Sequence, residues 1–285
     1  MVRAGEQVGK QRMSALKHAW REGLQAARLA GDRASACRLR ADFLFSRLLR
    51  LGRMPGYNAE RTVCLKEGTT LRYRFNRGDL QSLREVFLEE VYACELPFEV
   101  RTVLDLGANI GLASTWLARR SQGSPTQSNS VKPMQILAVE PVLANAKVAR
   151  TNFELNQVNG EVVSAAVGQQ TGHAWFEQRT ESNLGRLLDH EVQGSLPVPV
   201  VGIRDLLSRF PEGRVDLVKM DIEGGEEDLL GHETNWLAAV KALMVEWHDD
   251  RADSRPLIRN VQVAGFRHVP INIERQDNLS LFLKD

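Results

Sequence analysis

The sequence has few cysteines and no long apolar run. Its 285 residues include three cysteines, Cys37, Cys64 and Cys94, which are widely spaced and odd in number. They show neither a disulfide framework nor a metal-ligand spacing, so we expect a reducing, cytoplasmic location. No apolar run reaches the roughly 18 residues that a membrane span needs, and the N-terminus lacks the apolar core of a signal peptide. The sequence therefore predicts no membrane span.

An excess of charge of one sign is also missing, because the formal net charge is +1. The charge is uneven, however: residues 1–53 hold twelve Lys/Arg and four Asp/Glu, a local excess of +8 that leaves −7 for the remainder. The Lys and Arg side chains of a basic segment can bind phosphate groups, so an RNA-modifying enzyme remains an alternative. Its bases are not interleaved with aromatic residues, so we favour a solvated face and expect no nucleic-acid partner.

Two helices are predicted before the main domain. The first covers residues 5–30, where apolar residues recur at steps of three and four: Met13, Leu16, Trp20, Leu24 and Ala27. The second repeats this pattern from Cys37 to Leu51 and ends before Pro55-Gly56. We expect this helical hairpin, residues 1–56, to extend from a main domain of residues 57–285. Its apolar stripes predict docking on that domain or on a second subunit, with the basic face outward.

The main domain begins with β-type segments and continues as a strand–helix alternation. Residues 62–75 are expected to turn at Glu67-Gly68, and Asp79 is expected to cap the helix that follows. Strands are then predicted at 102–106, 135–140, 161–167, 215–220, 241–247, 266–272 and 279–283, and helices at 110–120, 142–157, 203–210, 225–238 and 254–264. This alternation indicates an α/β fold with seven strands in a mostly parallel sheet and helices on both faces. The link between the last two strands is short, so that pair must be antiparallel.

The segment 103–111 has the pattern of a buried strand, a glycine turn and a helix start. Gly107 allows a sharp turn, and Gly111 lets the helix pack close to the sheet. Dinucleotide sites read G-x-G-x-x-G, whereas here Asp105 precedes the turn and Asn109 lies within it. A carboxylate repels pyrophosphate but suits an ammonium group. S-adenosylmethionine has an ammonium group and no phosphate, so we favour it over NAD or a purely structural turn.

The second strand of the alternation ends at Glu140, which Pro141 follows. An acidic side chain at this strand tip can accept hydrogen bonds from both ribose hydroxyls of a nucleoside. Either motif alone is weak evidence for a cofactor site. The glycine turn and Glu140, in order on successive strands, together predict binding of S-adenosylmethionine.

Acidic residues and a histidine follow the fourth and fifth strands. Asp221 and Glu223 come at the carboxyl end of the strand 215–220, where ligands of open α/β sheets bind. The next strand carries Glu246 and His248 to the same edge, on one face. We interpret Asp221, Glu223 and His248 as candidate catalytic residues, with His248 either a general base or a structural histidine.

Three further interpretations concern these two strands. A hard metal ion held by Asp221, Glu223, Glu246 and His248 is an alternative, but without a compact metal motif we expect no metal. Lys219 alternates with Asp221 along the strand and is expected to pair with a carboxylate and hold it in place. Residues 226–228, Glu-Glu-Asp, are interpreted as surface charges that complement a helix dipole.

Two polar segments are expected to be surface loops. Residues 121–130 are rich in Ser, Gln and Asn and lengthen the link between the first two core strands. Residues 179–195, which include Ser182 and Asn183, either close over the site or form a plain surface loop.

The sequence resembles the FkbM-type family of class I S-adenosylmethionine-dependent methyltransferases over about residues 72–283. Four ordered segments carry the resemblance: Asp105-Leu-Gly-Ala-Asn-Ile-Gly111, Val139-Glu-Pro141, Ala165-Ala-Val-Gly168 and Lys219-Met-Asp-Ile-Glu-Gly-Gly-Glu226. Glu246-Trp-His248 is similar to the fifth-strand ending of the family. Gly225 departs from the common alanine, and the N-terminal helices lie outside the match.

The resemblance implies the Rossmann-like, seven-stranded class I sheet and O-methylation of hydroxyls on sugars, glycans or polyketide-type metabolites. It implies a cofactor site made of Asp105, Gly107, Asn109, Gly111, Glu140, Pro141 and Ala166. The expected reaction is in-line displacement at the sulfonium methyl by a hydroxyl of a small-molecule or glycan acceptor, accelerated mainly by positioning. The alternative from another class is a cofactor-binding scaffold without catalysis.

Overall fold

The computed structural model describes residues 17–46, 56–122, 133–178, 185–188, 190–249, 253–271 and 278–284. The chain divides into two compact units, residues 1–90 and 91–285, so the boundary falls after Glu90, whereas the sequence pattern placed it after Gly56. Most of the polar segment 121–130 lies outside the described residues, as do Ser182 and Asn183.

The N-terminal unit combines helices with a β-hairpin. A helix covers residues 17–29, and the later elements are α2 (Arg33–Phe45), β1 (Glu60–Cys64), β2 (Thr70–Arg74), α3 (Arg77–Leu83) and a π-helical turn (Arg84–Leu88). β1 and β2 pair antiparallel around the predicted turn, where Gly68 has φ 78°. Asn76, not Asp79, caps α3: its side chain accepts a hydrogen bond from the Asp79 N–H at 2.8 Å. The Asp79 carboxylate instead pairs with Arg74.

The helix at residues 17–29 packs through its small residues. Ala19 and Ala26 are buried, while Trp20 is 47% and Leu24 37% exposed. A Cβ added to Gly23 would lie 2.8 Å from the carbonyl oxygen of Arg40 in α2, so only a glycine allows the two helices to approach this closely. Trp20 and Leu24 therefore lie outside this close contact, which only small residues fit. The predicted docking of their apolar stripe on a second subunit stays a prediction. Met13 and Leu16 lie outside the described residues.

The second helix also buries a different face from the one predicted. In α2 the buried residues are Ser35, Leu39, Asp42 and Phe43, whereas Cys37 is exposed. Asp42 accepts a hydrogen bond from the Tyr73 hydroxyl at 2.7 Å, which offsets the cost of burying both polar groups. The helix therefore packs on the β1–β2 hairpin partly through polar contacts, which an apolar stripe does not reveal.

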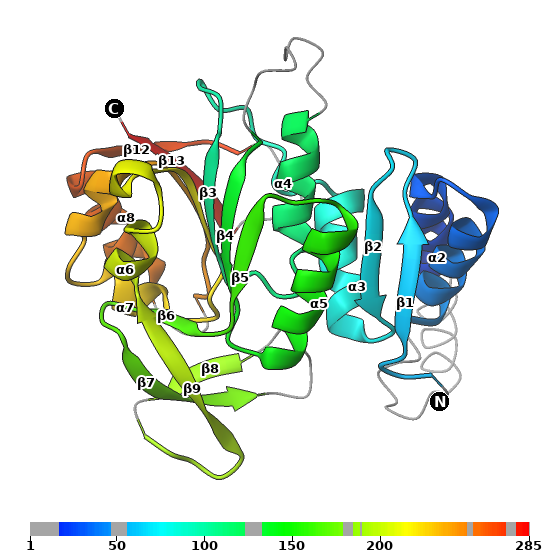
Figure 1. The fold of residues 1–285 in the computed structure, drawn as a ribbon, viewed down its shortest axis with the longest axis horizontal. Helices are drawn as coiled ribbons and strands as arrows, with labels where there is room; N and C mark the ends of the chain where they lie inside the picture. Colours follow the sequence, from blue (N-terminus) through cyan, green and yellow to red (C-terminus); the bar gives the residue numbers. More distant parts are fainter. Residues whose placement is uncertain are drawn as a thin grey trace, which may run out of the picture. The chain divides into compact units, whose positions relative to one another are not determined.

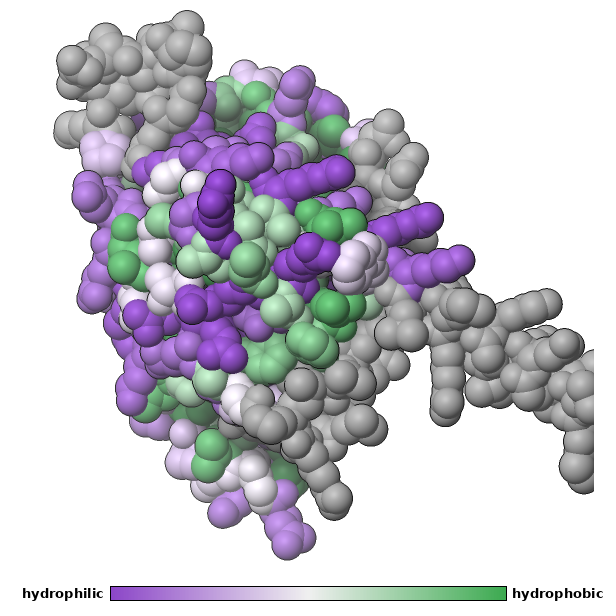
Figure 2. Space-filling view, turned by 90° about the vertical axis from the view of Figure 1, so that its right-hand side faces the viewer, coloured by the Kyte–Doolittle hydropathy of each residue, from purple (hydrophilic) through white to green (hydrophobic). Residues whose placement is uncertain are grey.

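The surface of this unit mixes basic and apolar groups. The Arg40 guanidinium lies 4.3 Å from the centroid of the Trp20 ring, and Phe45 is 43% exposed. Figure 2 shows a face of the chain on which hydrophilic side chains lie between hydrophobic ones. The basic segment therefore does not form a uniformly charged face in its described part.

The second unit contains the predicted seven-stranded sheet. Its strands are β3 (Thr102–Leu106), β4 (Gln135–Val139), β5 (Gly160–Val163), β10 (Val215–Met220), β11 (Val240–Glu246), β12 (Phe266–Val269) and β13 (Leu279–Lys284). They lie in the order β12-β13-β11-β10-β3-β4-β5. β3, β4, β5, β10 and β11 run parallel, and β13 is antiparallel to both β11 and β12. The predicted fold class, including the antiparallel last pair, is confirmed.

Helices cover both faces of this sheet. α4 (Leu112–Gln122) and α5 (Leu143–Leu155) lie on one face, and α6 (Ile203–Leu207), α7 (Glu226–Leu230) and α8 (Ser254–Val263) lie on the other (Figure 1). Short 3-10 turns follow α6 at Pro211–Gly213 and α7 at Asn235–Ala239. The central strands are therefore buried on both sides, and every residue of β10 is buried.

A second sheet was not predicted. It contains β6 (Ala166–Gly168), β7 (Gly172–Gln178), β8 (Gly185–Leu188) and β9 (Ser195–Gly202), in the order β6-β9-β7-β8. The single strand predicted at 161–167 is therefore wrong, because the chain leaves the first sheet after Val163 and joins the second at Ala166. Part of the predicted 179–195 loop forms β8, and the start of β9 lies in it as well.

The turn after β3 lies against the end of β10. Gly107 has φ 75°, and a Cβ added there would lie 1.7 Å from the carbonyl oxygen of Asp221. Gly111 also has φ 75°, and its added Cβ would lie 3.0 Å from the Ala149 Cβ in α5. Both glycines therefore serve close packing, Gly107 between two strand ends and Gly111 between α4 and α5.

We expect Gly107→Ala to reduce the free energy of unfolding by at least about 1–3 kcal/mol, because the new methyl group meets backbone and the left-handed conformation disfavours alanine. Urea denaturation measures the change. Gly172→Ala is the control, since an added Cβ there has no heavy atom within 4 Å, and its effect should stay within about 0.5 kcal/mol. Equal stability of the two variants would contradict the close approach.

Candidate active site

The candidate residues follow strands that end at one edge of the parallel sheet. The Asp221 N–H donates to the Leu106 carbonyl oxygen at 3.0 Å, which ties the end of β10 to the end of β3. The Gly107 N–H donates to the Val139 carbonyl oxygen at 3.0 Å, and the Glu140 N–H to that of Val163 at 3.0 Å. The segments after β3, β4 and β10 are therefore neighbours, at the edge where α/β proteins bind ligands.

The turn between β3 and α4 is held in left-handed backbone. Gly107 and Gly111 both have φ 75°, and Asn109 has φ 49°. The Asn109 N–H donates to Glu140 Oε2 at 2.9 Å. The glycine turn and the tip of β4, which the sequence put forward as one site, therefore touch each other directly.

The carboxylate of Asp105 lies beneath this turn and is fully buried. Its Oδ2 accepts a hydrogen bond from the Ser114 hydroxyl at 2.6 Å, and its Oδ1 lies 3.2 Å from Lys219 Nζ. The ammonium group that Asp105 meets in the structure is thus the chain's own. Ser114, in the first turns of α4, gave no signal in the sequence.

Lys219 connects the turn to the end of β10. Its Nζ donates to the Gly107 carbonyl oxygen at 2.9 Å and lies 3.5 Å from Asp221 Oδ2. Burial alone would lower the pKa of Lys219, but the charges of Asp105, Tyr92 and Asp221 raise that pKa well above its ordinary value. The lysine therefore stays charged, and its predicted pairing with a carboxylate is confirmed.

Glu140 is 5% exposed and forms three hydrogen bonds within the chain. Besides the bond from Asn109, its Oε1 accepts from the Val142 N–H at 2.9 Å and from Asn145 Nδ2 at 3.2 Å. Burial raises its pKa to about 7, against the opposing effect of these hydrogen bonds. A carboxylate at the tip of β4 is therefore oriented by backbone, and its ionisation changes near neutral pH.

Two other predicted cofactor residues lie after neighbouring strands. Pro141 is half-buried and directly follows Glu140. Ala166 is buried, begins β6 and pairs with Val200 of β9. It therefore belongs to the start of the second sheet, three residues after the end of β5.

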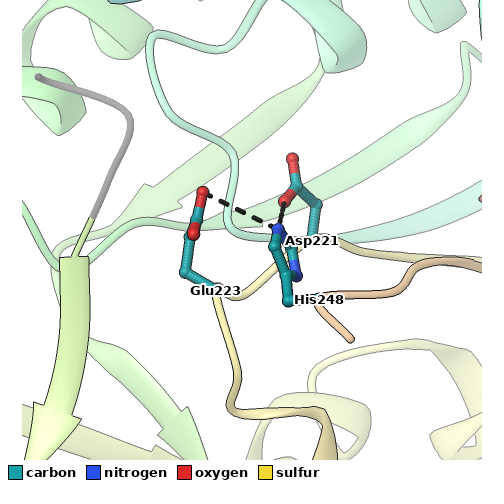
Figure 3. A group of neighbouring side chains, drawn as sticks. All are labelled: Asp221, Glu223 and His248. Carbon is teal, nitrogen blue, oxygen red and sulfur yellow. Dashed lines mark ion pairs between the residues drawn. The ribbon is translucent and has the colours of Figure 1, made fainter. Parts of the chain in front are cut away.

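Asp221, Glu223 and His248, the three predicted catalytic residues, lie together (Figure 3). His248 Nε2 lies 3.6 Å from Asp221 Oδ1 and 3.7 Å from Glu223 Oε1. The side chains are 13%, 28% and 20% exposed for His248, Asp221 and Glu223. The cluster is therefore partly open to solvent and can meet a ligand.

A third acidic residue, Glu226, orients the histidine. Its carboxylate is 2% exposed, and its Oε1 lies 2.9 Å from His248 Nδ1. The interpretation of Glu226 as a surface charge is therefore wrong: the first turn of α7 carries it inward, under the ring. Glu226 comes five residues after Asp221, in the first turn of a helix, and this position could have indicated that its side chain is directed inward. Glu246 is separate from the cluster, since its Oε1 accepts from Asn278 Nδ2 at 3.0 Å.

The acidic surroundings keep His248 protonated at neutral pH. Burial alone would lower its pKa, but the hydrogen bond with Glu226 and the charges of Asp221 and Glu223 raise that pKa to about 9. Because the pKa exceeds the ordinary value of 6.5, this pairing stabilises the fold below about pH 6.5 and the stabilisation is lost as the pH rises through about 9. In this state the carboxylates, rather than the ring, are the groups able to accept a proton.

We expect Lys219→Met to lower the free energy of unfolding by about 3–5 kcal/mol, because it leaves the carboxylate of Asp105 buried without its cation. The control is Lys241→Met, which also breaks an ion pair, to Asp216, but removes a side chain that is 59% exposed. That change should cost at most about 1 kcal/mol. Urea denaturation of both variants checks this, and equal losses would contradict a structural role for the buried ammonium.

None of the helices in the described ranges is long and apolar enough to cross a bilayer.

Similar solved structures include cofactor-bound Rv0187 from MTB, with 16% identity, a TM-score of 0.38, and coverage of 74% of this chain and 99% of that one. Another is the O-methyltransferase TomG from Streptomyces achromogenes in complex with SAM, with 16% identity, a TM-score of 0.37, and coverage of 65% of this chain and 74% of that one.

Sequence comparison identifies a domain in the second unit. The FkbM methyltransferase domain matches residues 105–268, which include the glycine turn, Glu140 and the cluster of Asp221, Glu223 and His248. A similar protein is "Methyltransferase 1" of Beauveria bassiana (strain ARSEF 2860), 27% identical over 222 residues, which cover 68% of this chain and 82% of that protein. The chain belongs to the FkbM methyltransferase family.

Proposed function

We propose that the protein transfers a methyl group from S-adenosylmethionine to a hydroxyl oxygen of a small-molecule or glycan acceptor. The observation that carries the proposal is the direct contact between the turn after β3 and the end of β10. Gly107 approaches the Asp221 backbone, and Asp221 faces His248. A ligand held by the turn therefore lies beside a cluster able to handle a proton.

The residues around the turn fit a nucleoside that has no phosphate. The carboxylate of Glu140 contacts the turn through the Asn109 N–H, whereas Asp105 beneath the turn is neutralised by Lys219. Ionised Glu140 would repel phosphate, but the two hydroxyls of a ribose can donate to it. We propose that Gly107, Asn109, Gly111, Glu140, Pro141 and Ala166 hold the cofactor, with Asp105 supporting the turn from below. When bound, S-adenosylmethionine supplies a methyl group that its sulfonium already activates.

The chain's own contribution to the reaction is positioning and removal of a proton. Asp221 and Glu223 are the candidate acceptors for the hydroxyl proton. The His248 ring contacts both carboxylates and is itself held by Glu226. Because the donor is activated, a correctly aligned acceptor should supply much of the acceleration. Removal of a general base typically costs about 10²–10⁴ in rate.

We expect Glu140→Gln to weaken binding of S-adenosylhomocysteine by about 1–3 kcal/mol, since the ribose loses a charged hydrogen-bond partner. Because the pKa of Glu140 is raised to about 7, the ionised, binding-competent form becomes more populated as the pH rises. Wild-type affinity should therefore increase by up to about tenfold from pH 6 to pH 8, and the Gln variant should lack this step.

Isothermal titration calorimetry at the two pH values measures both effects. Glu154→Gln, on the exposed side of α5, is the matched control and should bind like the wild type. Unchanged affinity in Glu140→Gln would contradict the ribose assignment.

We expect Asp221→Asn and Glu223→Gln to lower methyl transfer by about 10²–10⁴ while S-adenosylhomocysteine still binds. The measurement is transfer of labelled methyl from S-adenosylmethionine to extracts of glycans and hydroxylated metabolites, with total RNA as a separate acceptor. Label in RNA that is lost at high salt would favour the RNA-modifying alternative. Cofactor binding without label in any acceptor would favour the non-catalytic scaffold.

A further inference from the structure

We infer that Asp221, Glu223 and His248 bind a divalent cation, of which Mn²⁺ is the best match. The sequence favoured a site without metal, and the geometry of the three side chains points the other way. The inference rests on the proposed function only in that the cation would hold the acceptor hydroxyl. Binding of the cation itself requires no assumption about the reaction.

The histidine nitrogen lies at distances from both carboxylates that one ion can span. One atom from each of Asp221, Glu223 and His248 lies within 4.8 Å of the others. His248 Nε2 is 3.6 Å from Asp221 Oδ1 and 3.7 Å from Glu223 Oε1. Two atoms that each bind an ion at about 2.1 Å are at most about 4.2 Å apart. Both nitrogen–oxygen separations are already within that limit, and Figure 3 shows both carboxylates directed at the ring nitrogen.

The histidine is oriented as metal-binding histidines are. Glu226 Oε1 lies 2.9 Å from Nδ1, and its carboxylate is only 2% exposed. A cation that binds here displaces the proton from Nε2 to solvent, and the Nδ1–H donated to Glu226 leaves Nε2 as the nitrogen that faces Asp221 and Glu223. A carboxylate behind a ligating imidazole fixes the tautomer and the ring orientation and makes the other nitrogen a better ligand. The contact between Glu226 and His248 does not involve Asp221 or Glu223, the two carboxylates that would bind the ion.

The backbone also fixes the two carboxylates. Asp221 is held by the hydrogen bond from its N–H to Leu106 and by the close approach of Gly107. Glu223 has φ 55° and precedes Gly224, which has φ 98°. A left-handed conformation is unfavourable for a residue with a long side chain. Here it turns the chain so that Glu223 faces the same point as Asp221, two residues earlier.

The donor set selects the kind of cation. One imidazole nitrogen with two carboxylate oxygens suits Mn²⁺, since carboxylate favours Mg²⁺ and Mn²⁺ whereas imidazole favours transition metals. Asp221 and Glu223 are 28% and 20% exposed, so ligand positions remain for water or a substrate oxygen. A cation at this place binds a hydroxyl and lowers its pKa. With the cation bound, Asp221 and Glu223 are its ligands, and the hydroxyl proton passes to solvent instead of to these carboxylates.

The test is direct binding of Mn²⁺ to the full chain after chelator treatment and desalting, followed by electron paramagnetic resonance and calorimetry. We expect one Mn²⁺ per chain, and a loss of affinity of at least about tenfold in His248→Ala and in Glu223→Gln. Glu226→Gln, which removes only the orienting carboxylate, should weaken binding by about 10–100-fold. His173→Ala, a change at an exposed histidine of β7, is the control and should bind Mn²⁺ like the wild type.

Each variant is first checked by circular dichroism and by binding of S-adenosylhomocysteine, so that loss of Mn²⁺ is not loss of the fold. The inference is overturned if the wild type fails to bind Mn²⁺, Mg²⁺ or Zn²⁺ at millimolar concentration, or if the His248 and Glu223 variants bind Mn²⁺ unchanged. Methyl transfer that survives chelator in a protein that does not bind Mn²⁺ overturns the cation and leaves the proposed function intact. Stoichiometric Mn²⁺ binding that the variants abolish, without methyl transfer to any acceptor, supports the cation and counts against the proposed function.

Discussion

The arrangement of the site depends on one buried ammonium group. Lys219 Nζ contacts the Gly107 carbonyl oxygen, Asp105 and Asp221 at 2.9, 3.2 and 3.5 Å. A buried charge is tolerated only when it is paired and hydrogen-bonded. The ammonium group therefore requires the carbonyl oxygen and the two carboxylates to stay around it. Since Asp105 belongs to β3 and Asp221 follows β10, the lysine fixes the ends of two neighbouring strands around one point.

This constraint links the two halves of the site. The backbone of Gly107 lies so close to Asp221 that no side chain fits between them. A cofactor on the turn and an acceptor at Asp221 would then be neighbours without any movement of the chain. The charged groups follow the same division: Lys219 neutralises the carboxylate beneath the turn, whereas His248 lies among three carboxylates that attract protons or cations. The proposed transfer to a hydroxyl uses both, a fixed donor site and an adjacent group that receives the proton.

Much of the fold could be predicted because its signals are local. Runs of buried residues at 102–106, 135–139 and 215–220, each followed by a helical pattern, are enough to predict parallel strands. The second sheet could not be predicted, because β7 to β9 pair with one another and the intervening sequence carries no periodic apolar signal. The contact between the helix at residues 17–29 and α2 could not be predicted for a related reason: it selects small residues, whereas hydrophobicity points to Trp20.

The sequence by itself determined which residues gather at the edge of the sheet, because in a parallel sheet every residue that follows a strand lies at the same edge. That rule is enough to predict that Gly107, Glu140, Asp221 and His248 lie at this edge. Only the tertiary structure decided what each side chain faces. Asp105 meets the ammonium group of Lys219, and Glu226 lies under His248 instead of on the surface. These pairings depend on distances between side chains that are up to 114 positions apart in the sequence, and no local pattern encodes such distances.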